Sequence, residues 1–253
     1  QDETNDLVFI TAIFGTYHLA FLGPYLASLQ KCHPGSEIIV LWQDLPQHEV
    51  AFLRTAFPKC RFRKIAGTIR GNRDQRISRK VRLWAEVCGE YPGRPLCITD
   101  CDMLMVRPIS EFITDDFDVI YTWKESRWPI NTGVLLFRTG EIAKDFMREW
   151  AVLTEKLVAS RWKLRRALAA SGGADQQAFR QMVGFSDYRG TKTCMIGGRA
   201  MRCKGVWIAY LNEVRSVPIT SDTHLIHYKG GWHSALIEGG ALALTRANPE
   251  SKE

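Results

Sequence analysis

The chain has 253 residues, of which 45% are hydrophobic and 11% aromatic, so it can bury a large core and is not a disordered protein. Its formal net charge of +7 favours an anionic ligand, such as a nucleotide, a nucleic acid or an anionic membrane surface. No stretch is long and apolar enough to span a membrane, and the seven cysteines form no CxxC pair and no zinc-ligand spacing. We therefore expect reduced thiols and a cytoplasmic location.

Apolar runs typical of strands alternate along the chain with apolar stripes at helical spacing. The predicted strands span 7–12, 37–42, 61–65, 96–99, 118–122, 133–137, 206–209 and 224–227. The predicted helices span 19–30, 78–88 and 142–157, with another that begins at Pro46. This alternation predicts a single α/β domain over 1–240, with a mostly parallel central sheet flanked by helices, and a C-terminal tail over 241–253.

Two carboxylates, Asp100 and Asp102, follow the strand at 96–99 directly. Ligands of parallel α/β sheets bind beyond the carboxyl ends of the strands. Two carboxylates so close repel each other unless a cation lies between them, and carboxylate oxygens suit Mg²⁺ or Mn²⁺. The pair therefore indicates a divalent metal site that would serve a phosphate ligand. The alternative interpretation is an aspartate that caps the turn after the strand.

Two further polar clusters are candidates for contacts with a sugar. Asn131, Thr132 and Gly133 precede an apolar strand and combine hydrogen-bonding side chains with a residue that lets a ligand approach the backbone. Asp175 and Gln176 follow Gly172-Gly173 at the predicted start of a helix. Taken alone, the first cluster is better explained as a simple turn into the strand, and an ordinary helix cap explains the second equally well.

A run from His224 to His233 is the second informative segment. On a regular strand His224 and His227 face opposite sides, so one metal cannot bind both, and His227 at the strand end is the better ligand. Lys229 and the backbone of Gly230-Gly231 could hold a diphosphate. A buried histidine beside a turn is the alternative.

The order of these pieces resembles the metal-dependent GT-A glycosyltransferases, and most closely the retaining group that contains glycogenin and the lipopolysaccharide galactosyl- and glucosyltransferases. The matching runs span most of the chain in the family's order and are Thr11–Gly15, Lys80–Trp84, Ile98–Asp102, Asn131–Val134, Asp175-Gln176 and His227–Gly230. The family continues from the last run into Lys-Pro-Trp, where this chain has Gly231-Trp232-His233, so the role of that lysine either moves to Lys229 or is lost.

The resemblance implies a role for each matching residue. Thr11 and Ala12, at the end of the first strand, would receive the nucleobase and ribose, and Lys80 would contact the donor phosphates or sugar. Asp100 and Asp102 would hold Mn²⁺ or Mg²⁺ and the ribose, with His227 as a further metal ligand. The remaining implied contacts are those of Asn131, Asp175 and Gln176 with the transferred sugar, and of Lys229 and Gly230 with the diphosphate.

The implied function is transfer of a hexose from a nucleotide-diphosphate sugar, UDP-linked by resemblance, to a glycan, lipid-linked or protein acceptor. Neither Asp175 nor Gln176 is a compelling covalent nucleophile, so the resemblance favours retention by front-face attack of the acceptor. The basic aromatic run Arg161–Arg166 is by default a solvated helix face, and its alternative role is a peripheral membrane contact.

Three rival functions remain open from the sequence. Phosphatases of the haloacid-dehalogenase type also place Asp-x-Asp after an apolar strand, but they have Thr or Val where this chain has Leu104. A nucleic-acid-binding domain fits the charge, yet no nucleic-acid motif is present, so we expect no nucleic-acid partner. A nucleotide-sugar-binding domain without activity is the third.

Overall fold

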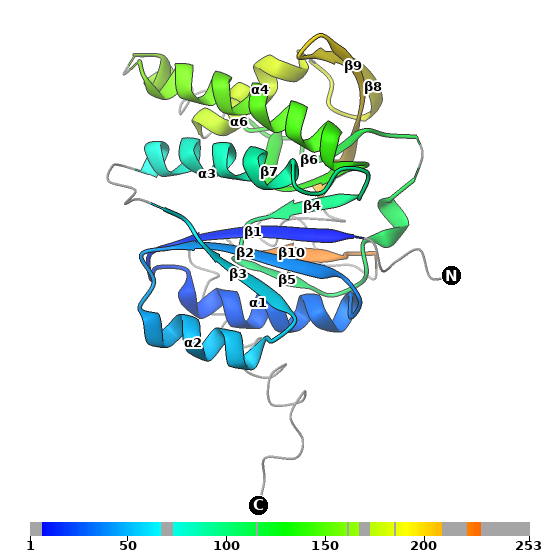
Figure 1. Cartoon of the computed structure of the whole chain (residues 1–253). Helices are drawn as coiled ribbons and strands as arrows, with labels where there is room; N and C mark the ends of the chain where they lie inside the picture. The colour runs from blue at the N-terminus through cyan, green and yellow to red at the C-terminus, as the bar shows by residue number, and fades with distance from the viewer. Residues whose placement is uncertain are drawn as a thin grey trace, which may run out of the picture. The chain divides into compact units, whose positions relative to one another are not determined.

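The structure is a computed structural model that describes residues 7–66, 73–114, 116–160, 162–166, 173–184, 186–208 and 222–228 (Figure 1). The chain divides into two compact units, which we describe separately. The first unit comprises residues 1–66, 99–111 and 209–253, and the second comprises residues 67–98 and 112–208.

The first unit is built on three parallel strands with two helices on one side of them (Figure 1). Its elements are β1 (Val8–Phe14), α1 (Leu19–Cys32), β2 (Glu37–Gln43), α2 (Gln47–Ala56), β3 (Cys60–Lys64), β5 (Met103–Met105) and β10 (Leu225–His227). Strand β1 and the middle strand of the three, β2, are buried along almost their whole length, which is typical of strands covered on both faces. The first strand, helix and second strand were all predicted, as was the continuation of α1 through Pro24.

A second, two-stranded sheet of the first unit holds the segment that follows Asp102. β5 pairs antiparallel with β10, with His227 opposite Met103. The backbone N–H of Met105 donates to Ser28 Oγ of α1 over 3.0 Å. A 3₁₀ turn, η2 (Ser110–Phe112), comes after β5. Helix α1 therefore fixes the position of β5 within this unit.

The second unit mixes parallel and antiparallel pairing. Its elements are α3 (Arg73–Cys88), β4 (Leu96–Thr99), β6 (Val119–Trp123), β7 (Ile130–Phe137), α4 (Gly140–Val158), α6 (Ala174–Val183), β8 (Gly190–Ile196) and β9 (Arg199–Trp207). The last residue of β4, Thr99, belongs to the first unit. The strand order of the second unit is β4-β7-β6-β9-β8, in which β6 is parallel to β9 but antiparallel to β7, and β8 is antiparallel to β9.

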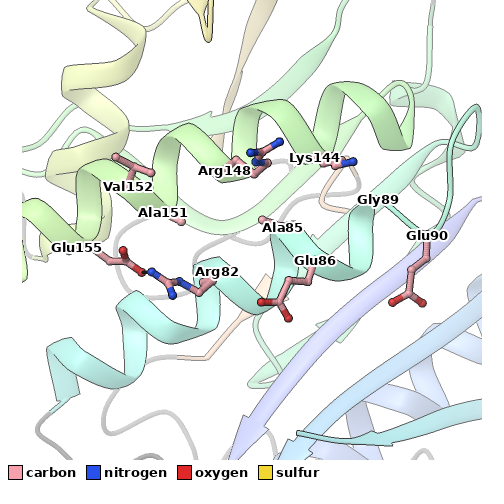
Figure 2. Close-up of a pocket in the computed structure, with 10 residues that line it drawn as sticks. All are labelled: Arg82, Ala85, Glu86, Gly89, Glu90, Lys144, Arg148, Ala151, Val152 and Glu155. Carbon is pink, nitrogen blue, oxygen red and sulfur yellow. Dashed lines mark ion pairs between the residues drawn. The ribbon is translucent and has the colours of Figure 1, made fainter. Parts of the chain in front are cut away.

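Helices α3 and α4 of the second unit lie side by side (Figure 1). The apolar stripe of α4 is buried as its spacing predicts except at Leu153, which is half-buried, and Thr139 caps the helix by accepting a hydrogen bond from the N–H of Ile142. A groove of about 500 Å³ runs along the two helices, where Arg82 and Glu155 form an ion pair of 2.5 Å (Figure 2). None of the predicted site residues lines this groove.

Several predicted elements differ from the observed ones. Strands β5 and β8 were not predicted, α3 begins at Arg73 rather than Ser78, and β9 is longer than the predicted strand at 206–209. The strand expected at 133–137 begins at Ile130, so Asn131 and Thr132 lie inside β7 and not before it. Among the described helices, none is long and apolar enough to cross a membrane.

Candidate functional site

Asp100, Asp102 and His227 come together in the first unit. The two aspartates lie between β4 and β5, and His227 ends β10. The pairing of β10 with β5 brings His227 to this point, and the N–H of Tyr228 donates to the carbonyl of Asp102 over 2.9 Å. Two backbone contacts thus unite segments that are far apart in the sequence.

The geometry of this cluster fits a divalent cation. His227 Nε2 lies 3.3 Å from Asp102 Oδ1 and 3.9 Å from Asp100 Oδ2. One ligand atom from each of the three residues lies within 4.8 Å of the other two. The side chain of His227 is 1% exposed, that of Asp102 is 14% exposed and that of Asp100 is 28% exposed, so the cluster opens on the side of Asp100. Two hard carboxylate oxygens and one imidazole nitrogen form a donor set that suits Mn²⁺ or Mg²⁺.

The electrostatics of the cluster keep Asp102 ionised. Burial by itself raises the pKa of the Asp102 carboxyl. The charge of His227 and its hydrogen bond outweigh this effect, and with the charge of His18 they lower the pKa below its usual value. Sequence reasoning did not single out His18, although it lies at the start of α1, in the loop that follows β1.

His224 and His227 have separate roles, as strand geometry predicts. His224 is buried, with Nδ1 2.6 Å from the carbonyl oxygen of Pro108 and Nε2 2.8 Å from Glu111 Oε1. His227 instead faces the two aspartates. His224 therefore holds the segment after β5, while His227 is placed to act as a ligand.

Thr11 and Ala12 lie inside β1 and not at its end, because Ile13 and Phe14 continue the pairing with β2. The strand ends at Phe14 and is followed by Gly15, whose φ of +68° suits a glycine and whose N–H donates to the carbonyl of Gln43. The hydroxyl of Thr11 is buried and has no hydrogen-bond partner among the described residues. The role of these two residues in nucleobase and ribose binding stays a prediction.

A second polar cluster forms in the second unit around Asp175. Thr132 Oγ1 on β7 donates to Asp175 Oδ2 on α6 over 3.0 Å, and the backbone carbonyl of Asp175 accepts from Trp150 Nε1 over 2.8 Å. Asn131 is buried, and its Oδ1 accepts from the N–H of Gly133 over 2.8 Å. Gly173 occupies the N-cap of α6, so Asp175 lies in the first turn and is not the cap.

The other predicted site residues are placed as follows. Gln176 lies next to Asp175 in the first turn of α6. Lys80 lies on α3, with its Nζ 4.5 Å from the ring centroid of Trp84, a cation–π contact. Lys229 and Gly230 lie outside the described residues, so the predicted diphosphate half of the site stays a prediction.

A comparison with protein-family models finds no match, and a comparison with curated proteins finds none either. Solved structures do resemble the chain. A galactosyltransferase, LgtC, in complex with donor and acceptor sugar analogues, is 16% identical with a TM-score of 0.58, and the match covers 97% of each chain. A glycosyltransferase involved in glycosylation of the major capsid of PBCV-1 is 13% identical with a TM-score of 0.57, covering 93% of this chain and 98% of that one.

The glycosyltransferase GlyE of Streptococcus pneumoniae TIGR4 is 13% identical with a TM-score of 0.59. That match covers 96% of this chain and 63% of the GlyE chain, so this chain spans less than two thirds of that protein. The fold expected from the sequence is thereby confirmed: the chain has the mixed α/β GT-A fold of these glycosyltransferases.

Proposed function

We propose that this protein is a metal-dependent glycosyltransferase that moves a hexose from a nucleotide-diphosphate sugar to an acceptor. The observation that carries the proposal is the cluster of Asp100, Asp102 and His227 within a GT-A fold. The donor is proposed to be a UDP-sugar, and the acceptor a glycan, a lipid-linked sugar or a protein. Trp162, 62% exposed and stacked with Arg166, supports a peripheral membrane contact of the basic aromatic run.

The three clustered side chains would hold Mn²⁺ or Mg²⁺. The bound cation would supply Lewis-acid stabilisation of the charge that develops on the departing phosphate. His227 and the buried side of the cluster exclude water from one face, while the more exposed Asp100 leaves a face for the donor. The ionised state of Asp102 means that this ligand has no proton to lose before a cation binds.

Asn131, Asp175 and Gln176 are proposed to bind the hexose. The hydrogen bond from Thr132 fixes one oxygen of Asp175, and a group so engaged is better suited to orienting a hydroxyl than to attacking the anomeric carbon. This favours front-face attack by the acceptor, whose proton passes to the departing phosphate. A covalent hexosyl adduct on Asp175, detected by mass spectrometry, would contradict this mechanism.

Lys80, Lys229 and Gly230 are proposed to contact the donor phosphates. The ammonium of Lys80 lies against the ring of Trp84, which restricts its positions. A Lys80→Ala variant is expected to raise KM for the donor more than it lowers kcat.

A donor screen tests the proposal. Thermal stability and sugar release are measured with UDP- and GDP-hexoses, with and without Mn²⁺, for the wild type, Asp102→Asn and the matched surface variant Asp145→Asn. A ligand that binds only the folded protein raises the melting temperature with its concentration. Metal-dependent stabilisation of the wild type and Asp145→Asn, but not of Asp102→Asn, is the expected result.

The same screen separates the alternatives. Stabilisation without turnover on any acceptor indicates a nucleotide-sugar-binding domain without activity. Release of phosphate from simple phosphate esters indicates a phosphatase. No response to any donor contradicts the proposed function.

A further inference from the structure

Two cysteines of the β8–β9 hairpin lie in contact with each other. Cys194 Sγ and Cys203 Sγ are 2.8 Å apart, and both residues are buried. The hairpin turns through Gly197 and Gly198, both with positive φ, which is the conformation that a tight two-residue turn requires. The strands run antiparallel with Cys194 opposite Met201 and Cys203 opposite Lys192.

This register places the two thiols on the same face of the hairpin. Side chains alternate between faces along a strand, so Cys194, Met201 and Cys203 point to the buried face, while Thr193 and Met195 are exposed on the other. Cys194 and Cys203 are diagonal neighbours, and such pairs have Cα atoms about 7–8 Å apart. A disulfide spans at most about 7 Å between Cα atoms, so bond formation requires only a small approach of the two strands.

The environment makes the two sulfurs unequal. A hydrogen bond from Cys203 lowers the pKa of Cys194, although burial and the charge of Asp118 act in the opposite direction. The same interaction, together with burial, raises the pKa of Cys203. Cys194 keeps 7% of its surface exposed whereas Cys203 is fully buried, so Cys194 is the thiol that a small disulfide reaches first and Cys203 is the resolving thiol. Burial raises the pKa of Cys60 to about 12, and it also raises the pKa of Cys97, which keeps these two thiols unreactive.

We propose that Cys194 and Cys203 are a reversible modification site at which an intramolecular disulfide forms by exchange with a small-molecule disulfide. The Cys194 thiolate attacks one sulfur of the small disulfide, forms a mixed disulfide and releases one thiolate. The Cys203 thiol then loses its proton and attacks Cys194 Sγ, which closes the protein disulfide and releases the second thiolate. The two protein thiols lose two electrons and two protons, and the small disulfide is reduced to two thiols.

The position of the pair determines what the disulfide does. β8 ends the strand order of its unit, and β9 pairs with both β8 and β6. A disulfide at this point ties the edge strand to its neighbour and closes a short loop around the glycine turn. It is expected to raise the melting temperature by roughly 3–8 °C, because a cross-link of this loop size restricts the unfolded chain.

Oxidised glutathione is the probe in the experiment. The folded wild type is incubated with it, free thiols are alkylated, and the protein is digested with trypsin without reduction. Cleavage after Lys192, Arg199, Arg202 and Lys204 leaves residues 193–199 joined to residues 203–204 through the disulfide. This linked peptide pair is the expected product, and dithiothreitol should release it.

Matched variants keep the test specific. Cys32→Ser removes a partly exposed thiol elsewhere and should retain the linked pair. Cys203→Ser should stop at a glutathione adduct on Cys194 and lose the rise in melting temperature. Cys203→Ala provides the same test if the serine variant folds poorly. Alkylation of both thiols in the oxidised wild type, or a stable adduct on Cys194 while Cys203 remains free, would overturn the proposal.

Discussion

Two polar clusters, one in each unit, are held in place by different interactions. Asp100, Asp102 and His227 form a charged cluster in which two carboxylates share one imidazole. The cluster of Asn131, Thr132 and Asp175 is held by direct hydrogen bonds to neutral groups of the protein. The first arrangement suits a cation that offsets its remaining negative charge, whereas the second is held in place by the protein alone.

This difference predicts which substitutions should change cation affinity and which should change turnover alone. Under the proposed function the donor binds through the cation, so a change in the charged cluster is expected to alter cation affinity together with turnover. A change in the hydrogen-bonded cluster is expected to alter the orientation of the proposed sugar and to leave cation affinity unchanged. The following predictions test whether the two clusters act separately in this way, and they are given in order of decreasing effect on turnover.

Asp102→Asn is expected to lower turnover about 1,000-fold, since the loss of one charged ligand removes several kcal/mol of stabilisation. Mn²⁺ affinity, measured by titration calorimetry, should fall in parallel. Asp145→Asn, which removes a carboxylate in an exposed ion pair with Arg199, is the control and should change neither quantity. Equal Mn²⁺ affinity in Asp102→Asn and the wild type would show that the cluster is not a metal site.

His227→Asn is expected to weaken Mn²⁺ binding about 100-fold and to lower turnover accordingly. His224→Asn is the matched control, because that histidine is equally buried but contacts Pro108 and Glu111 instead of the aspartates. We expect the control to lose thermal stability while the remaining folded protein keeps its Mn²⁺ affinity. If both variants lose Mn²⁺ affinity equally, the effect is one of folding and not of ligation.

Thr132→Val is expected to lower kcat about 10-fold, because Asp175 loses the hydrogen bond that orients it. Thr132→Ser keeps a hydroxyl and should restore most of kcat. Mn²⁺ affinity is expected to be the same in all three proteins. A valine variant with normal kcat, or a serine variant as impaired as valine, would argue against an orienting role.

The smallest effect on turnover, and a clear one on stability, is expected at His33. This histidine accepts a hydrogen bond from the N–H of Ile109, in the segment after β5, and burial lowers its pKa to about 4. His33 takes up a proton near pH 6.5 in the unfolded chain but only near pH 4 in the folded protein. The free energy of unfolding is therefore highest above pH 6.5 and decreases as the pH falls toward 4. The free energy of unfolding should be about 3 kcal/mol higher at pH 7 than at pH 4 because of this group.

Denaturant unfolding at pH 7, 5.5 and 4 measures this contribution. His33→Gln retains an acceptor but cannot be protonated, so its free energy of unfolding should depend less on pH than that of the wild type. His48→Gln removes a side chain that is 81% exposed and should follow the wild type. Identical pH profiles for wild type and His33→Gln would contradict the prediction.

The sequence predicted the elements whose signal is local. The apolar run of β1 and the helical stripe of α4 are buried because their own periodicity requires it. β5 has three residues and exists through its pairing with β10, which no local pattern reveals. β8 is exposed along one face and carries a weak apolar alternation, although the Gly197-Gly198 turn was a usable signal for the hairpin. Strand direction was equally hidden, since β7 is buried throughout yet pairs antiparallel with β6.

The residues of the candidate site likewise divide into those with a local sequence signal and those that depend on tertiary contacts. Asp100 and Asp102 were found because a strand signal ends directly beside them, and His227 because it ends another. The hydrogen bond between Thr132 and Asp175 depends on how β7 meets α6, and the effect of His18 on Asp102 depends on tertiary packing. Neither follows from spacing in the sequence.

The pairing of β10 with β5 also has a consequence for the order in which the molecule becomes functional. Until β10 docks, Asp100 and Asp102 form a pair of like charges without their histidine. Under the proposed function, cation binding and docking of β10 are therefore thermodynamically linked: each is expected to promote the other by the same free energy. A divalent cation would then stabilise the docked position of β10, and protection of the β10 amides from hydrogen exchange should increase with the cation concentration.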